Sequence, residues 1–206
     1  MASLYFKYAA MNSGKSTQLL QAQYNYFERG MNPVAMTARL DDRAGVGKIS
    51  SRLGIYHPAD TFDTTTDVFA FIDDMHRTKA VDALFVDEAQ FLTEEQVMQC
   101  ARVVDDLHIP VLAYGLKTDF MGKLFPGSEA LLRFADNIEE IKAICWCGKK
   151  ATMTARISPK GEVVRAGQQV AIGGNDMYTS LCRKHFMRGE AKAALPASDD
   201  KKKSAA

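Results

Sequence analysis

The chain has 206 residues, with 26 Lys and Arg against 25 Asp and Glu, which gives a formal net charge of +1. This balance argues against a protein held to nucleic acid mainly by a basic surface, because such domains usually have a pI above about 9. The 47% hydrophobic and 25% charged residues are typical of a globular protein and exclude general disorder. The chain shows neither an apolar run of about 18 residues nor a secretory signal at residues 1–16, so we expect a cytoplasmic protein without a membrane partner.

The first half of the chain predicts strands that alternate with helices. An apolar, aromatic-rich run at residues 4–9 predicts a buried strand, and the helix after it is expected to end at Gly30. Residues 33–38 predict a second strand. Residues 40–54 are polar and glycine-rich, which predicts a long surface loop.

The same alternation continues through the middle of the chain. Residues 67–77 predict a helix, residues 82–86 a strand, and Thr93 begins a helix with capping-box spacing. A further strand is expected at residues 110–114. Strands and helices in this order are typical of βαβ units, so we expect an α/β fold with a parallel sheet.

After about residue 143 cysteines and short polar strands at 152–157 and 162–165 replace the alternation, and we expect a small metal-stapled unit. We expect the chain to divide into three segments: a P-loop domain at 1–143, a zinc-binding domain at 144–189, and a tail at 190–206. The tail is rich in Ala, Lys, Asp and Ser and has almost nothing to bury, which predicts disorder.

The strongest local motif lies between the first strand and the first helix. It matches the P-loop pattern GxxxxGK[ST] except that alanine replaces the first glycine, which requires a negative φ at that position. In such a loop Lys15 reaches the β- and γ-phosphates of a nucleotide and Ser16 ligates Mg²⁺, whereas the alternative is a chance turn that caps a helix. The predicted ATP-binding residues are Ala9, Ala10, Met11, Asn12, Ser13, Gly14, Lys15 and Ser16.

Two acidic residues close the strand at 82–86. Asp87 is in the usual setting of a Walker B carboxylate that holds Mg²⁺. Because successive strand residues point to opposite sides, Glu88 is expected to face a neighbouring pocket. The alternative is a pair of solvated acids at a strand end. The DEAQ sequence also resembles a helicase motif, so by itself it does not separate a kinase from a translocase.

Three cysteines and a histidine in the last third of the chain predict a zinc site. Cys145 and Cys147 form a CxC pair, and Cys182 and His185 form a CxxH pair. Three thiolates and one imidazole complete a tetrahedral structural site and leave no position open for catalysis. The alternative is three buried thiols and an exposed histidine. Cys100 is expected to be an inert core residue.

These motifs together resemble one protein family. The segments AAMNSGKST, DEAQFL, YGLKTDF, CxC and VAIGGNDMYTSLCRKH are similar to those of the zinc-containing cytosolic (type II) thymidine kinases, bacterial branch, and the resemblance covers residues 3–188. It implies a RecA-like P-loop domain with a small zinc domain. It also implies ATP-dependent phosphorylation of the 5′-hydroxyl of thymidine, and of deoxyuridine, to the monophosphate in pyrimidine salvage.

The resemblance also implies roles for individual residues. Glu88 would be the general base, Gln90 would belong with Asp87 to the ATP and Mg²⁺ set, and Asp41 and Arg43 would support phosphoryl transfer. The nucleoside pocket would be walled by Phe91, Leu116, Phe120 and Phe125, with a lasso loop that contributes Gln169, Val170, Ala171, Ile172, Gly173 and Tyr178. The departures from the family pattern are Ala9 for Gly, Ala89 at a variable small position, and His185 for a fourth Cys.

The family resemblance further implies a homotetramer that is inhibited by the end product dTTP. The sequence leaves two alternatives to a kinase. A nucleic-acid-dependent ATPase is prompted by DEAQ and the zinc unit, but the chain lacks a second RecA-like domain and a clustered basic patch. A non-catalytic zinc adaptor would leave Lys15, Asp87 and Glu88 unexplained as a set.

Overall fold

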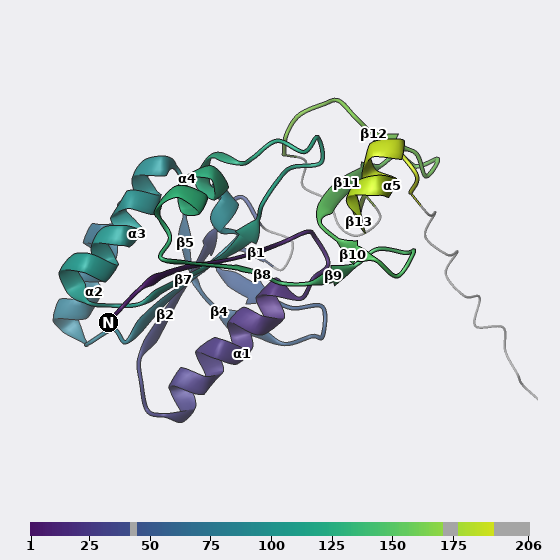
Figure 1. The fold of residues 1–206 in the computed structure, drawn as a ribbon. Helices are drawn as coiled ribbons and strands as arrows, with labels where there is room; N and C mark the ends of the chain where they lie inside the picture. The colour runs from purple at the N-terminus through teal and green to yellow at the C-terminus, as the bar shows by residue number, and fades with distance from the viewer. Residues whose placement is uncertain (42–44, 171–176, 192–206) are drawn as a thin grey trace, which may run out of the picture.

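The computed structural model describes residues 1–41, 45–170 and 177–191, and it contains a central parallel β-sheet (Figure 1). The strand order is β5-β2-β6-β7-β1-β8, and every neighbouring pair is parallel. The predicted α/β class is confirmed. The six strands are β1 (Leu4–Ala9), β2 (Pro33–Ala38), β5 (Asp60–Phe62), β6 (Ala83–Asp87), β7 (Val111–Leu116) and β8 (Asn137–Glu140).

Helices cover both faces of the sheet, with α1 on one side and α2, α3 and α4 on the other (Figure 1). Along β6, Phe85 packs in the cluster that contains Leu19 of α1, whereas Val86 packs in the cluster that contains Val97 of α3. Burial on both faces leaves the strand ends as the place for polar chemistry. The helices are α1 (Lys15–Glu28), α2 (Val68–Thr78), α3 (Glu94–Leu107) and α4 (Pro126–Phe134), with a short 3₁₀ helix η1 (Ala89–Phe91).

The helix ends follow the sequence signals. Asp67 caps α2 by accepting a hydrogen bond from the Ala70 N–H at 2.9 Å. The predicted capping box of α3 is confirmed, because Thr93 Oγ1 accepts from the Gln96 N–H at 3.1 Å and Gln96 Oε1 accepts from the Thr93 N–H at 3.0 Å. Gly30 follows α1 with a φ of 74°, which suits a glycine just past a helix end.

The predicted surface loop at 40–54 is wrong in part, because it contains half of a β-hairpin. Strand β3 (Lys48–Ser50) pairs antiparallel with β4 (Tyr56–Pro58). Ile49 is 1% exposed and joins the apolar cluster under α1, while its two neighbours in the strand are exposed. A three-residue strand with one inward residue is too short to show an alternating pattern.

The C-terminal unit consists of short antiparallel strands and one helix, and it lies at one end of the sheet (Figure 1). The two predicted strands, at 152–157 and 162–165, are present, with bounds that differ by at most one residue at either end. The elements are β9 (Ala143–Ile144) paired with β10 (Lys150–Ala151), then β11 (Met153–Ile157) between β12 (Val163–Val164) and β13 (Tyr178–Leu181), and α5 (Arg183–Arg188). Within the described ranges, no helix is long and apolar enough to cross a membrane.

Candidate active site

The turn from β1 into α1 has the backbone conformation of an anion-binding loop. Ala9 is an ordinary strand residue, whereas Asn12 and Gly14 carry the positive φ values, 65° and 81°. Asparagine and glycine are the residue types that tolerate this conformation best. The N-cap residue of α1 is Gly14, which has no side chain that could cap the helix, and the first turn of α1 lines the cavity described below, so its backbone N–H groups suit a bound phosphate.

The side chains of this turn fit a phosphate as well. Ser13 Oγ is buried and is without a hydrogen-bond partner among the residues that the structure describes. Lys15 is 8% exposed, and its Nζ donates to the Ala10 carbonyl at 3.4 Å. A buried ammonium and a buried hydroxyl in one turn at a helix N-terminus match the donors that a nucleotide phosphate requires.

Asp87 joins β6 to α1 and provides a possible metal ligand. Ser16 Oγ donates to Asp87 Oδ2 at 2.9 Å, and the Glu88 N–H donates to Asp87 Oδ1 at 3.0 Å. Burial, and then the negative charge of Glu88, raise the pKa of Asp87 to about 7, against the lowering effects of Ser16 and Lys15. A carboxylate and a hydroxyl oxygen side by side are the donors that Mg²⁺ takes beside a nucleotide, so these residues fit the ion.

The expectation that Glu88 faces away from Asp87 is wrong. Strand β6 ends at Asp87, and Glu88 adopts a left-handed conformation with φ 52° and ψ 37°, so strand alternation does not extend to it. Both carboxylates line the same cavity. Gln90 Nε2 donates to Glu88 Oε2, and Gln90 Oε1 accepts from the Leu116 N–H at 2.9 Å, which ties Glu88 to β7. A Cβ at Gly115 would lie 2.9 Å from Gln90 Oε1, so this arrangement requires glycine there.

A cavity of about 400 Å³ collects most of the predicted site residues. Ala9 and Ala10 do not line it. Arg43, Ala171, Ile172 and Gly173 lie outside the described residues. The predicted residues that do line the cavity are Met11, Asn12, Ser13, Gly14, Lys15, Ser16, Asp41, Asp87, Glu88, Gln90, Phe91, Leu116, Phe120, Phe125, Gln169, Val170 and Tyr178.

Two regions of the cavity were not predicted from the sequence. The hairpin contributes Lys48 and Arg52, and Arg52 Nη2 donates to Asn12 Oδ1 in the P-loop. The C-terminal unit also holds the P-loop backbone, because the Met11 N–H donates to Thr154 Oγ1 at 3.1 Å and the Met11 carbonyl accepts from Ser180 Oγ. No sequence signal points to these contacts, which join residues up to 169 positions apart.

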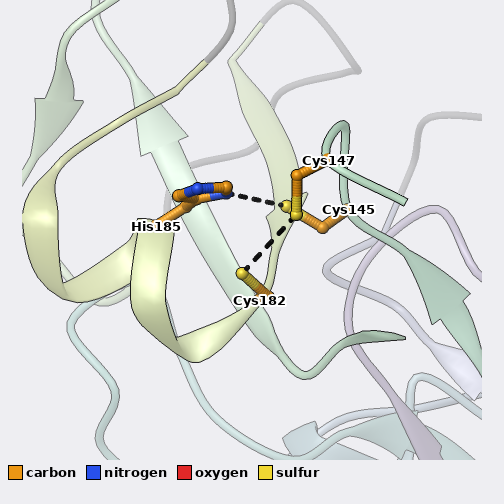
Figure 2. Close-up of side chains that lie close together, drawn as sticks. All are labelled: Cys145, Cys147, Cys182 and His185. Atoms are coloured by element: carbon orange, nitrogen blue, oxygen red, sulfur yellow. Dashed lines mark hydrogen bonds between the residues drawn. The ribbon is translucent and has the colours of Figure 1, made fainter. Parts of the chain in front are cut away.

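The four predicted zinc ligands converge on one point (Figure 2). Their ligand atoms all lie within 4.8 Å of one another, and the three cysteines are free thiols. Cys145 Sγ is 3.4 Å from His185 Nδ1, and Cys147 Sγ is 4.0 Å from Cys182 Sγ. The backbone N–H of His185 lowers the pKa of Cys182, which favours the thiolate that binds metal. This cluster could hold zinc as a closed four-ligand site.

Trp146 and Glu190 fix the orientation of the histidine ligand. The Trp146 ring stacks on His185 with centroids 4.2 Å apart and planes 8° apart, and its Nε1 donates to the Glu190 carbonyl at 3.2 Å. The Glu190 carboxylate lies 3.6 Å from His185 Nε2, opposite the nitrogen that faces the sulfurs. A carboxylate on the outer nitrogen is the usual partner of a metal-bound histidine. Glu190 belongs to the predicted disordered tail at 190–206, of which the structure describes only residues 190 and 191.

The Asp87→Asn variant is expected to be more stable than the wild type above pH 7 when metal is chelated. The folded-state pKa of about 7 lies above the ordinary 3.8, so the contribution of Asp87 to stability is full below about pH 4 and is lost as the pH rises through 7. The ionised carboxylate then costs on the order of 4 kcal/mol, and the amide removes that cost. Urea unfolding at pH 5 and pH 8 in EDTA measures it.

The matched control for this experiment is Asp105→Asn, at an exposed position of α3. The free energy of unfolding of Asp87→Asn should exceed that of the wild type by more at pH 8 than at pH 5. The free energy of unfolding of Asp105→Asn should stay near the wild-type value at both pH values. A pH-independent difference would contradict the burial argument.

The P-loop, the hydroxyl–carboxylate pair and the second carboxylate on one cavity with aromatic residues define a P-loop phosphotransferase. A family model described as thymidine kinase matches residues 2–186. The chain therefore belongs to the thymidine kinase family, and it is a transferase of the nucleoside kinase type.

Curated relatives support this membership. The thymidine kinase of Ruegeria pomeroyi is 59% identical over 90% of this chain and 94% of its own length. That of Agrobacterium fabrum is 54% identical over 91% of this chain and 97% of its own length. Among solved structures, a replication initiator bound to AMPPCP and single-stranded DNA gives a TM-score of 0.40 at 19% identity over 68% of this chain and 40% of its own, which is too low to support a conclusion.

Proposed function

We propose that the protein transfers the γ-phosphoryl group of ATP to the 5′-hydroxyl of thymidine, and of deoxyuridine, to form the nucleoside monophosphate for pyrimidine salvage. The observation that carries this proposal is that a single cavity of about 400 Å³ joins the P-loop to an aromatic wall formed by Phe91, Phe120, Phe125 and Tyr178. Glu88 lines the same cavity. A donor phosphate and an acceptor hydroxyl must share one cavity for direct transfer.

The P-loop end of the cavity binds the donor in this proposal. The P-loop of residues 9–16 wraps the phosphates with the part that lines the cavity, residues 11–16. Lys15 neutralises charge on the phosphates, and Ser13 donates its hydroxyl to them. Asp87 and Ser16 hold Mg²⁺, which supplies further charge neutralisation when bound. Asp41, which lines the cavity, and Arg43 support the transferring phosphoryl group.

The other end of the cavity binds the nucleoside. Phe91 and Phe125 meet edge to face, with centroids 5.9 Å apart, and provide a rigid apolar wall for a flat base. Leu116 and Phe120 complete that wall, and backbone groups of 169–173 with Tyr178 bind the pyrimidine. Glu88, held by Gln90, accepts the proton of the 5′-hydroxyl as attack proceeds.

A labelled-phosphate transfer assay across a nucleoside panel tests the proposal. We expect label on thymidine and deoxyuridine, and no stimulation of ATP hydrolysis by single-stranded DNA. Hydrolysis that depends on single-stranded DNA, without label on any nucleoside, would contradict the kinase and favour the nucleic-acid-dependent ATPase.

We also propose that the chain divides at about residue 143 into a kinase domain and a zinc and lasso domain that ends near residue 189. The resemblance to type II thymidine kinases supports two further proposals, a homotetramer and feedback inhibition by dTTP. Light scattering of the purified protein measures the mass of the assembly, and titration of dTTP into the transfer assay measures the inhibition.

The Cys182→Ser variant is expected to raise the KM for thymidine about tenfold or more and to lower the melting temperature. Zinc on Cys145, Cys147, Cys182 and His185 cross-links the two sides of the predicted lasso, so its loss frees that segment. The KM for ATP should change less, because Lys15 and Ser16 lie on α1 and only the Met11 backbone of the P-loop bonds Thr154 and Ser180 of the C-terminal unit. Steady-state kinetics and thermal unfolding measure these effects.

His185→Cys is the conservative control and should be tolerated, because thiolate and imidazole both suit tetrahedral zinc. Metal analysis of protein purified without chelator should give one zinc per chain. A Cys182→Ser protein with the wild-type melting temperature and thymidine KM would contradict the proposed role of the metal.

A further inference from the structure

A buried arginine contacts the wall of the cavity without lining the cavity itself. Arg156 lies on β11 and is 9% exposed. Its Nε and Nη2 donate to the Tyr178 hydroxyl at 3.1 and 2.9 Å, and Nη2 also donates to the Gln168 carbonyl at 3.1 Å. Tyr178 lines the cavity, whereas Arg156 does not. Arg156 can therefore affect the shape of the cavity only through residues that it contacts, such as Tyr178.

The same guanidinium connects the C-terminal unit to the kinase unit, which is the part of the chain up to about residue 143 that contains the central sheet. Its central carbon lies 3.8 Å from the centroid of the Phe120 ring, and Phe120 is 1% exposed. Phe120 follows β7 in the kinase unit, while Tyr178 is opposite Arg156 in the β11–β13 ladder. The Arg156 guanidinium thus stacks on Phe120 and donates hydrogen bonds to Tyr178, and it sets the distance between these two wall residues.

Arg156 also joins both ends of the predicted lasso. Gln168 immediately precedes the lasso and Tyr178 ends it, and both bond the same guanidinium. Asp119 supports the same region from the kinase unit, because its Oδ2 accepts from Gln169 Nε2 at 3.0 Å. The closing contacts of the lasso therefore depend on one side chain in addition to the metal.

Stability alone does not explain a buried cation at this position. In the described part of the chain, no carboxylate lies within ion-pair distance of Arg156; its partners are a phenol, a carbonyl and a ring face. Burial of a cation against neutral partners is costly, so packing alone would favour an apolar side chain. The planar fork of arginine supplies several donors in one plane with a stacking face, which lysine and methionine do not.

We infer that Arg156 is a positioning residue for the nucleoside, which holds Phe120, Tyr178 and both ends of the lasso in the geometry that binds the base. This inference rests on the proposed function. It assigns Arg156 to nucleoside binding and not to phosphoryl transfer, because its contacts are all at the acceptor end of the cavity.

The test compares Arg156→Met, Arg156→Lys and wild-type protein in steady-state kinetics with ATP and thymidine. Loss of the charged hydrogen bonds should raise the KM for thymidine by about tenfold or more. The kcat, the KM for ATP and the zinc content should stay near wild-type values. The KM of Arg156→Lys for thymidine should lie between those of the wild type and Arg156→Met, because an ammonium keeps the charge but cannot stack on Phe120 and hydrogen-bond Tyr178 and Gln168 at the same time.

Arg165→Met is the matched control. Arg165 makes the same kinds of contact in the same unit, with its Nη2 donating to the Phe186 carbonyl and its guanidinium 4.8 Å from the Phe186 ring, away from the cavity. Arg165 is exposed, whereas Arg156 is buried, and the control should keep the wild-type KM for thymidine.

Three results would overturn the inference: an unchanged thymidine KM in Arg156→Met, an equal rise in Arg165→Met, or a fall in kcat alone. If Arg156→Met does not fold, Arg156→Lys is the deciding variant. A raised KM for thymidine with a wild-type kcat supports the inference, and an unchanged KM or a fall in kcat alone overturns it. A wild-type protein without thymidine kinase activity would contradict the proposed function, whereas an active wild type with an unaffected Arg156→Met would contradict only this inference.

Discussion

The kcat of the Glu88→Gln variant is expected to be about 10²–10⁴ lower than that of the wild type, with the Kd values for ATP and thymidine nearly unchanged. The 5′-hydroxyl is a poor nucleophile, and a carboxylate that accepts its proton in the transition state accounts for a factor of this size. An amide has the same shape and still accepts the hydrogen bond from Gln90 Nε2, so the cavity should keep its form.

Glu94→Gln, at an exposed ion pair between α3 and Arg133, is the matched control and should keep the wild-type kcat. Stopped-time product assays give kcat, and titration calorimetry gives the two Kd values. A loss of less than about threefold in Glu88→Gln would place the general base elsewhere.

Lys15→Ala is expected to lower kcat/KM for ATP by about 10²–10³, because one buried donor to the transferring charge is lost. Lys15 lies at the first position of α1, where the helix N-terminus and the ammonium act on the same phosphate. Initial-rate measurements at low ATP give the ratio directly.

The control for Lys15→Ala is Lys7→Ala, on the strand that leads into the P-loop, where the lysine pairs with Glu139 at the surface. It should leave kcat/KM for ATP unchanged. If Lys15→Ala also keeps the wild-type value, the P-loop assignment is wrong.

The parts of the site that the sequence predicts correctly are those where a short motif lies at the end of a regular element. The P-loop follows β1, and Asp87 ends β6, so the parallel sheet brings Ser16 and Asp87 into contact. The Cys/His cluster that could hold zinc comes as two close pairs, and their spacing is typical of metal ligands in a sequence.

The parts that the sequence misses depend on backbone conformations or strand registers without a local signal. Glu88 leaves the strand in a left-handed conformation, which the alternation rule does not foresee. Thr154 and Ser180 reach Met11 only because β11 and β13 pair in a particular register, and Arg156 reaches Tyr178 through the same ladder. Register between distant strands is set by tertiary packing, which a single sequence does not show.

In the proposed function, one cavity holds the γ-phosphate of ATP in line with the 5′-hydroxyl of thymidine, and Glu88 lies at that hydroxyl. A crystal structure with thymidine and a non-hydrolysable ATP analogue tests it most directly. We expect the nucleoside 5′-oxygen within about 3.2 Å of a Glu88 carboxylate oxygen, and the γ-phosphate at Lys15. A nucleoside whose 5′-oxygen faces away from Glu88, or one bound outside the cavity that contains Lys15, would contradict the account.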